Sequence, residues 1–126
     1  MSGCINISDN AFANLTNIHT LIMYRCNQSI ITDNVFVNLP NLRILNISAC
    51  TQFTDNALKY LTNIYILIMS NCNQSRITDN AFVNTHLLHT LDITFCDQLT
   101  KNIFRHLKNI KLVNCDISIV ISSLND

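Results

Sequence analysis

Apolar and polar positions alternate along short stretches of this chain, and each stretch ends at a cysteine. The same frame, an apolar residue followed by x-x-Leu-x-apolar-x-x-Cys, returns at residues 18–26, 42–50, 64–72 and 88–96. Alternation over so few residues is typical of a short β-strand with one buried face. We therefore predict one short strand ahead of each of these cysteines. Residues 110–115 fit the frame in two registers, so the register of the last strand stays undecided.

A second pattern follows each cysteine and predicts the start of a helix. An apolar residue precedes Ser or Thr, and Asp usually comes next, as in Ile31-Thr32-Asp33, although Lys101 breaks this rule. Ser or Thr at the N-cap accepts a hydrogen bond from the first turn, and Asp is favoured by the positive end of the helix dipole. Apolar residues at i, i+3 and i+4 then predict a two-turn helix with a buried face. The residues expected in these faces are Ala11, Phe12, Leu15, Val35, Phe36, Leu39, Ala57, Leu58, Leu61, Ala81 and Phe82.

The cysteines give the period of the repeat. They stand at positions 4, 26, 50, 72, 96 and 115, so spacings of 22 and 24 residues alternate before a last spacing of 19. One strand and one short helix cannot bury an apolar side alone, so successive units must stack to form a core. We expect an α/β solenoid of about five turns, with short parallel strands on its concave face and short helices on its convex face. The whole chain, 1–126, is expected to be one domain with an irregular last turn, 97–126.

The frame L-x-x-L-x-I-x-x-C, followed by segments such as I-T-D-N-A-F, resembles the cysteine-containing leucine-rich repeats of F-box-type ubiquitin-ligase subunits. It is similar also to repeat proteins of giant viruses and protists. The resemblance covers roughly residues 4–115 and implies a right-handed leucine-rich-repeat solenoid, a horseshoe arc that binds a protein partner through its concave sheet. An alternative that it implies is the substrate-recognition part of a ubiquitin-ligase adaptor, although the residues before Cys4 contain no F-box.

Charge and hydropathy argue against several classes of partner. The chain has eight Lys and Arg, eight Asp and Glu and no run of either sign, so we expect neither nucleic acid nor a membrane surface as a partner. The first four residues begin no secretion signal, and no apolar run approaches the roughly 18 to 20 residues that span a bilayer. We therefore expect a cytoplasmic protein, in the host cytoplasm if the chain is viral.

The cysteines and histidines suit structural roles better than chemical ones. All six cysteines are expected in one buried column, as small groups whose thiols are weak donors, and side chains that point the same way disfavour disulfides. No C-x-x-C pair is present, and His86-x-x-His89 has no acidic or cysteine partner nearby in sequence. With a single glycine there is no phosphate-binding loop, and no nucleophile elbow or metalloprotease motif occurs. We expect no enzyme activity, no metal and no cofactor.

The residues that alternate with the buried ones should line the concave face, where repeat proteins bind partners. Four isoleucines form an expected apolar patch there, and aromatic and Arg side chains around an apolar centre are typical of interface hot spots. The strand propensity of β-branched residues is the alternative explanation. The candidate partner-binding residues are Ile22, Tyr24, Arg25, Ile44, Tyr65, Ile66, Ile68, Asp92 and Phe95.

Neither end of the predicted solenoid has a polar cap. The residues before Cys4 leave no room for the apolar frame of a first strand, and residues 117–121 are largely apolar. Because terminal repeats need polar caps to shield the stacked core, we expect either a homodimer through an uncapped end or a piece of a longer array.

Overall fold

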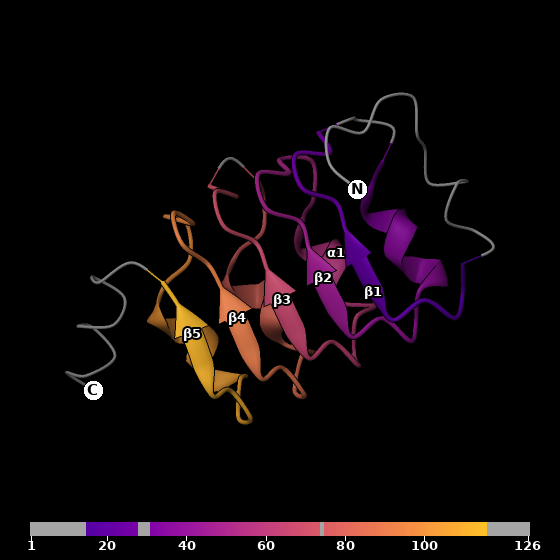
Figure 1. Ribbon diagram of the computed structural model, residues 1–126. Helices are drawn as coiled ribbons and strands as arrows, with labels where there is room; N and C mark the ends of the chain where they lie inside the picture. The colour runs from indigo at the N-terminus through magenta and orange to yellow at the C-terminus, as the bar shows by residue number, and fades with distance from the viewer. Residues whose placement is uncertain (1–14, 28–30, 74, 116–126) are drawn as a thin grey trace.

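The computed structural model describes residues 15–27, 31–73 and 75–115. These residues form one five-stranded parallel sheet in chain order, with short helical turns behind it (Figure 1). The strands are β1 (Thr20–Ile22), β2 (Ile44–Asn46), β3 (Ile66–Ile68), β4 (Thr90–Asp92) and β5 (Leu112–Asn114). The helical turns are η2 (Asp33–Asn38), α1 (Asp55–Leu58), η3 (Asp79–Phe82) and η4 (Lys101–Arg105). The α/β solenoid predicted from the repeat is confirmed.

Adjacent strands pair in parallel without a slip, so equivalent residues of successive repeats lie side by side. Thr20 pairs with Ile44, Ile44 with Ile66, and Ile66 with Thr90. The next residue of every strand belongs to a buried row that faces the helical turns. Its members in the first four strands are Leu21, Leu45, Leu67 and Leu91. The strand frame predicted from alternation is therefore confirmed in its positions and in its buried face.

The last strand decides between the two registers that the sequence left open. Leu112 pairs with Thr90 and Val113 with Leu91, so Val113 takes the place of the buried leucine. Cys115 then lies two residues beyond that row, where the other repeats carry Met or Ile. The expectation of six cysteines in one column is thus wrong at Cys115. Val113 follows its partner Leu91 in β4 by 22 residues, whereas Cys115 follows Cys96 by only 19.

All four described helical turns begin at a threonine, as predicted. Each threonine hydroxyl accepts a hydrogen bond from the backbone N–H two residues on, at 3.2 or 3.3 Å. The caps are Thr32, Thr54, Thr78 and Thr100. The predicted short helices are present, but most are shorter than two turns: three are 3-10 helices of four to six residues and α1 is an α-helix of four. A repeat this short must also hold a strand and two connections, and short segments favour 3-10 geometry.

The Asp that follows these caps joins neighbouring repeats, a role that the sequence pattern did not indicate. Asp55 accepts hydrogen bonds from the backbone N–H and the hydroxyl of Thr78, at 2.5 and 2.6 Å. Asp79 accepts the same two bonds from Thr100. Lys101 stands at the next equivalent position and cannot accept such bonds.

Buried aromatic rings fill the space between the sheet and the helical turns. Phe36 and Phe53 have no exposed surface, and their ring centroids lie 5.2 Å apart. The residues predicted to form helix faces from Val35 to Phe82 are buried. Leu15 is 41% exposed, so its predicted burial is wrong; it belongs to the first unit, whereas its counterparts lie between two repeats. Residues 11 and 12 of the same prediction lie outside the described residues.

Candidate functional site

The predicted apolar patch lies on the concave side of the sheet, on β1, β2 and β3. Ile44 and Ile66 are partners in adjacent strands, and Ile68 shares the face of Ile66 on β3. These three side chains are half-buried, whereas Ile22 is 46% exposed. Asn46 stands between Ile22 and Ile68 in their row, so the patch is divided. We define the concave patch as Ile44, Ile66 and Ile68, with Ile22 as a separate apolar side chain at the β1 edge.

Tyr65 lies at the edge of this face, one residue before β3, and it is stacked between neighbours that the prediction missed. The guanidinium carbon of Arg43 lies 5.1 Å from the centroid of the Tyr65 ring. The rings of Tyr65 and His89 have centroids 4.7 Å apart with planes inclined at 51°. Arg43 and His89 occupy the same position in their own repeats, directly before the strand.

A continuous line of residues occupies this position in all five repeats. We call it the rim stripe, and its members are His19, Arg43, Tyr65, His89 and Lys111. Backbone hydrogen bonds of 2.8 or 2.9 Å join each member to the next, from the N–H of the later residue to the carbonyl of the earlier one. The stripe therefore has the spacing of adjacent parallel strands, about 4.8 Å per step.

Arg25 and Phe95 lie in the turns that follow the strands, in a backbone conformation that the sequence did not reveal. Together with Ala49 and Asn71 they have φ of 58° or 59°, in the left-handed region. This turn leaves the Phe95 side chain 57% exposed and places the Arg25 guanidinium 5.1 Å from the ring of Tyr24, which is 36% exposed. These side chains are therefore accessible and lie beside the sheet face, around the apolar patch.

Asp92 lines a hollow over β3, β4 and β5. The hollow has a volume of about 260 Å³, and its lining residues are Ile68, Thr90, Leu91, Asp92, Leu112, Val113 and Asn114. One oxygen of Asp92 accepts hydrogen bonds from the backbone N–H of Thr94 at 3.0 Å and from its hydroxyl at 2.7 Å. Asn46 holds the equivalent turn after β2 through Ser48 N–H at 2.9 Å. The side chain of Asp92 therefore shapes a turn as well as lining the hollow.

The central cysteines serve as links between repeats. The thiol of Cys50 donates to the carbonyl of Met23 at 2.8 Å, that of Cys72 to Ile47 at 3.2 Å and that of Cys96 to Met69 at 2.9 Å. Each acceptor lies three residues before the cysteine of the preceding repeat. The structural interpretation of these three thiols is supported by their complete burial.

The pKa values of Cys50 and Cys96 argue against a nucleophilic role for these two thiols. Burial raises the pKa of Cys50 above its usual range. The hydrogen bond with Cys72, followed by burial, raises the pKa of Cys96. Because the thiolate is the reactive form, both residues are held in their inert state at neutral pH.

Cys26 departs from the prediction that disulfides are disfavoured, since it is disulfide-bonded.

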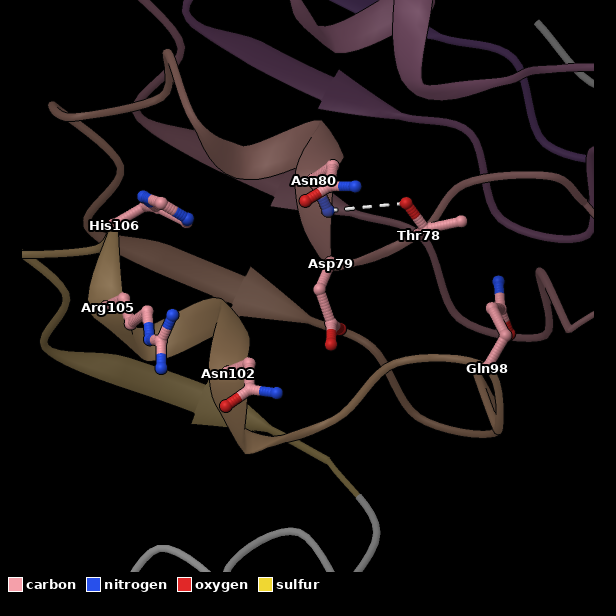
Figure 2. Close-up of a pocket in the computed structure, with 7 residues that line it drawn as sticks. All are labelled: Thr78, Asp79, Asn80, Gln98, Asn102, Arg105 and His106. Carbon is pink, nitrogen blue, oxygen red and sulfur yellow. Dashed lines mark hydrogen bonds between the residues drawn. The ribbon is translucent and has the colours of Figure 1, made fainter.

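A polar hollow of about 300 Å³ lies on the helical side between η3 and η4 (Figure 2). Its lining residues are Thr78, Asp79, Asn80, Gln98, Asn102, Arg105 and His106. Asp79 and Gln98 already bind the neighbouring repeats, Asp79 through Thr100 and Gln98 through the Cys72 carbonyl at 2.8 Å. A second hollow of about 370 Å³ adjoins the equivalent Gln52, together with Arg76. The hollows recur with the repeat, so we attribute them to the stacking of units.

The histidines do not gather into a metal site in the part of the chain that the structure describes. No group of three or more His, Cys, Asp or Glu side chains there could hold a metal ion. Nδ1 of His89 lies 2.9 Å from the hydroxyl of Thr90, and Nδ1 of His19 lies 3.1 Å from the carbonyl of Asn41. Among the described residues, no helix is long and apolar enough to cross a bilayer.

The stacked parallel strands, the short threonine-capped helical turns and the buried leucine row define a leucine-rich-repeat protein. Residues 1–111 match the BspA type leucine rich repeat region in six copies. Because the match spans most of the chain, the protein belongs to this leucine-rich-repeat family.

The fold is similar to that of a chain in the crystal structure of the Rad7 and Elc1 complex in yeast. The TM-score is 0.67 at 21% sequence identity, and the likeness covers 92% of this chain and 36% of that chain. This chain therefore spans about a third of the length of the solved one, and at this identity the likeness concerns the fold alone. Among curated proteins, no sequence matches this chain.

Proposed function

We propose that this protein is a non-enzymatic scaffold that binds a protein partner through the concave face of its sheet. The observation that carries the proposal is the apolar and aromatic surface left accessible there. Its members are Ile22, Tyr24, Ile44, Ile66, Ile68 and Phe95. The core is already filled by the buried leucine row and the phenylalanines, so the fold does not need these side chains inside. Leucine-rich repeats generally mediate protein–protein interaction, and repeat folds offer such a surface to partners.

Strand propensity explains part of this pattern, because β-branched residues suit any strand position. It does not explain Tyr24 and Phe95, which lie in turns and remain 36% and 57% exposed. Aromatic side chains beside an apolar centre are typical of binding hot spots. We infer that Arg25 and Asp92 contribute polar contacts at the edges of the same surface.

The experiment is affinity capture from a lysate of the native host with a variant that carries Ile44→Ser, Ile66→Ser and Ile68→Ser together. We expect at least a tenfold loss of captured protein relative to the parent chain. The matched control carries Val37→Ser and Val83→Ser, which alter exposed apolar residues within η2 and at the C-cap of η3, on the helical side. Far-UV circular dichroism establishes that both variants fold. Equal capture by the triple variant and the parent chain would contradict the proposal.

Substrate recognition within a ubiquitin-ligase adaptor is a second proposal. It is supported only by the resemblance of the repeat frame to cysteine-containing repeats of ligase subunits. Co-purification of a ligase core with the tagged chain would support it, and capture of partners without any ligase subunit would contradict it.

We also propose that the protein acts in the cytoplasm, that its source is a protist or a virus, and that an uncapped end can form a homodimer. Immunofluorescence in the host tests the location. Light scattering tests the oligomeric state, because a monomeric mass across concentrations would rule out the dimer.

A further inference from the structure

We propose that the rim stripe determines which partner the concave face accepts. The partner is an extended peptide segment that carries at least two carboxylates beside apolar side chains. The carboxylates bind along the rim stripe, and the apolar side chains pack on the concave patch. This inference rests on the proposed binding function and adds the chemistry of the partner.

The rim stripe carries exposed basic side chains, and most of the described acidic side chains lie elsewhere. All five positions of the rim stripe hold a basic or aromatic residue, and Arg43 and Lys111 are both exposed. Three of the five described acidic residues stand at the helix starts instead. There, Asp33, Asp55 and Asp79 accept hydrogen bonds from the threonine of the next repeat. Asp92 is the one acidic residue in a described strand, and one of its carboxylate oxygens already accepts two hydrogen bonds from Thr94. The strand starts at Arg43 and Lys111 carry exposed positive charge, which favours an anionic partner.

The rim stripe lies directly beside the concave patch. Arg43 directly precedes Ile44, and Tyr65 directly precedes Ile66, on adjacent strands. A ligand that reaches both surfaces must combine negative charge with apolar groups within a few ångströms. An acidic peptide with aliphatic side chains meets this requirement.

The spacing of the two exposed charges in the rim stripe matches an extended peptide. Arg43 and Lys111 are three strand steps apart, which is about 14 Å at the usual separation of parallel strands. An extended peptide advances about 3.3 Å per residue, so two carboxylates about four residues apart would reach both charges. This geometry predicts a preference for acidic residues at i and i+4 over adjacent ones.

The aromatic member of the rim stripe argues for a peptide over a single-stranded nucleic acid. Bases bind by stacking on open aromatic faces. The Tyr65 ring is half-buried and is contacted by both Arg43 and His89, so it offers little open surface for a base.

The test uses the full chain and fluorescein-labelled octapeptides of Leu and Ser that carry two Glu residues at i and i+4. Matched probes place the two Glu side by side, replace both Glu with Lys, or replace the peptide with an oligo-dT strand of similar length. Fluorescence anisotropy at low and high salt measures binding. We expect the i, i+4 Glu peptide to bind at least tenfold more tightly than the Lys peptide, with an affinity that falls as salt rises.

Variants assign this binding to the rim stripe. Arg43→Glu and Lys111→Glu should each weaken binding of the Glu peptide by tenfold or more, and Arg43→Gln should weaken it less. Lys59→Glu makes the same charge change at an exposed residue directly after α1, and it should change binding by less than twofold. Thermal melts of every variant establish that it is folded.

The inference is overturned if no Glu peptide binds, if the Lys peptide or oligo-dT binds as tightly, or if the two Glu variants bind like the parent chain. Such a result is distinguishable from failure of the proposed function. If rim-stripe variants have no effect while the triple Ser variant still abolishes capture from lysate, only the partner chemistry is wrong. If the triple variant captures normally, the proposed function itself fails.

Discussion

Asp33 and Thr54 are joined by two hydrogen bonds across a repeat boundary. One carboxylate oxygen of Asp33 accepts the backbone N–H of Thr54 at 2.9 Å, and the other accepts its hydroxyl. The same hydroxyl oxygen accepts the N–H of Asn56 at 3.2 Å and so caps α1. The Thr54 side chain thus caps its own helical turn and is also bonded to the preceding repeat. The threonine that marks a helix start in the sequence therefore helps to hold stacked repeats together.

Removing this acceptor should destabilise the solenoid. We expect Asp33→Ala to lower the free energy of unfolding by about 1–3 kcal/mol, because hydrogen bonds to a charged group are lost and a part-buried N–H is left without its partner. Urea unfolding followed by circular dichroism measures the change. Asp97→Ala, at an exposed position, is the matched control and should change stability by less than about 0.5 kcal/mol. Equal effects of the two substitutions would show that the Asp–Thr link contributes nothing.

The left-handed turns store backbone strain that can be relieved. Ala49 has φ of 59°, a region where the Cβ atom of a non-glycine residue costs roughly 1 kcal/mol. Ala49→Gly should therefore stabilise the fold by up to about 1 kcal/mol, less the entropy that glycine adds to the unfolded chain. Ala57→Gly makes the same change within α1 and should destabilise it by about 1 kcal/mol. If both substitutions shift the melting temperature in the same direction, the strain argument is wrong.

The buried thiol of Cys50 should make the protein less stable in alkaline solution. Burial raises the pKa of Cys50, so the folded state keeps its proton at pH values where the unfolded chain loses it. The contribution is complete below the unfolded cysteine pKa of about 8.5 and is lost as pH rises through the folded value. We expect the urea midpoint to fall between pH 7 and pH 9.5.

A Cys50→Ala variant separates this effect from other alkaline titrations. It should be less stable at pH 7, because the thiol that donates to the Met23 carbonyl is gone, but its midpoint should fall less on raising the pH. An identical pH dependence in the variant and the parent chain would mean that Cys50 does not control it.

The sequence predicted the strands well because their pattern is set by burial. Leu45 and Leu67 must face the helical turns in every repeat, so alternation alone locates the rows and the register. The threonine caps were predictable for a similar reason, since each helical turn needs an acceptor for its free amides.

Other features could not be predicted from the sequence pattern. The 3-10 turns were missed because N-cap and face patterns are alike for short 3-10 and α-helical segments. Cys115 was assigned to the wrong column because the cysteine spacing and the strand spacing separate only in the last repeat. The rim stripe was missed because its five positions share charge and aromatic character but not residue identity. The turns at Arg25 and Phe95 were missed because neither residue type signals a positive φ.

Site-specific photocrosslinking tests the central claim, that the concave face binds the partner, most directly. Ile66→p-benzoylphenylalanine places the crosslinker on the concave patch, and Val83→p-benzoylphenylalanine places it on the helical side. After irradiation in host lysate, we predict covalent adducts to a protein partner from position 66 and none from position 83. Adducts from position 83 with none from position 66 would contradict the account.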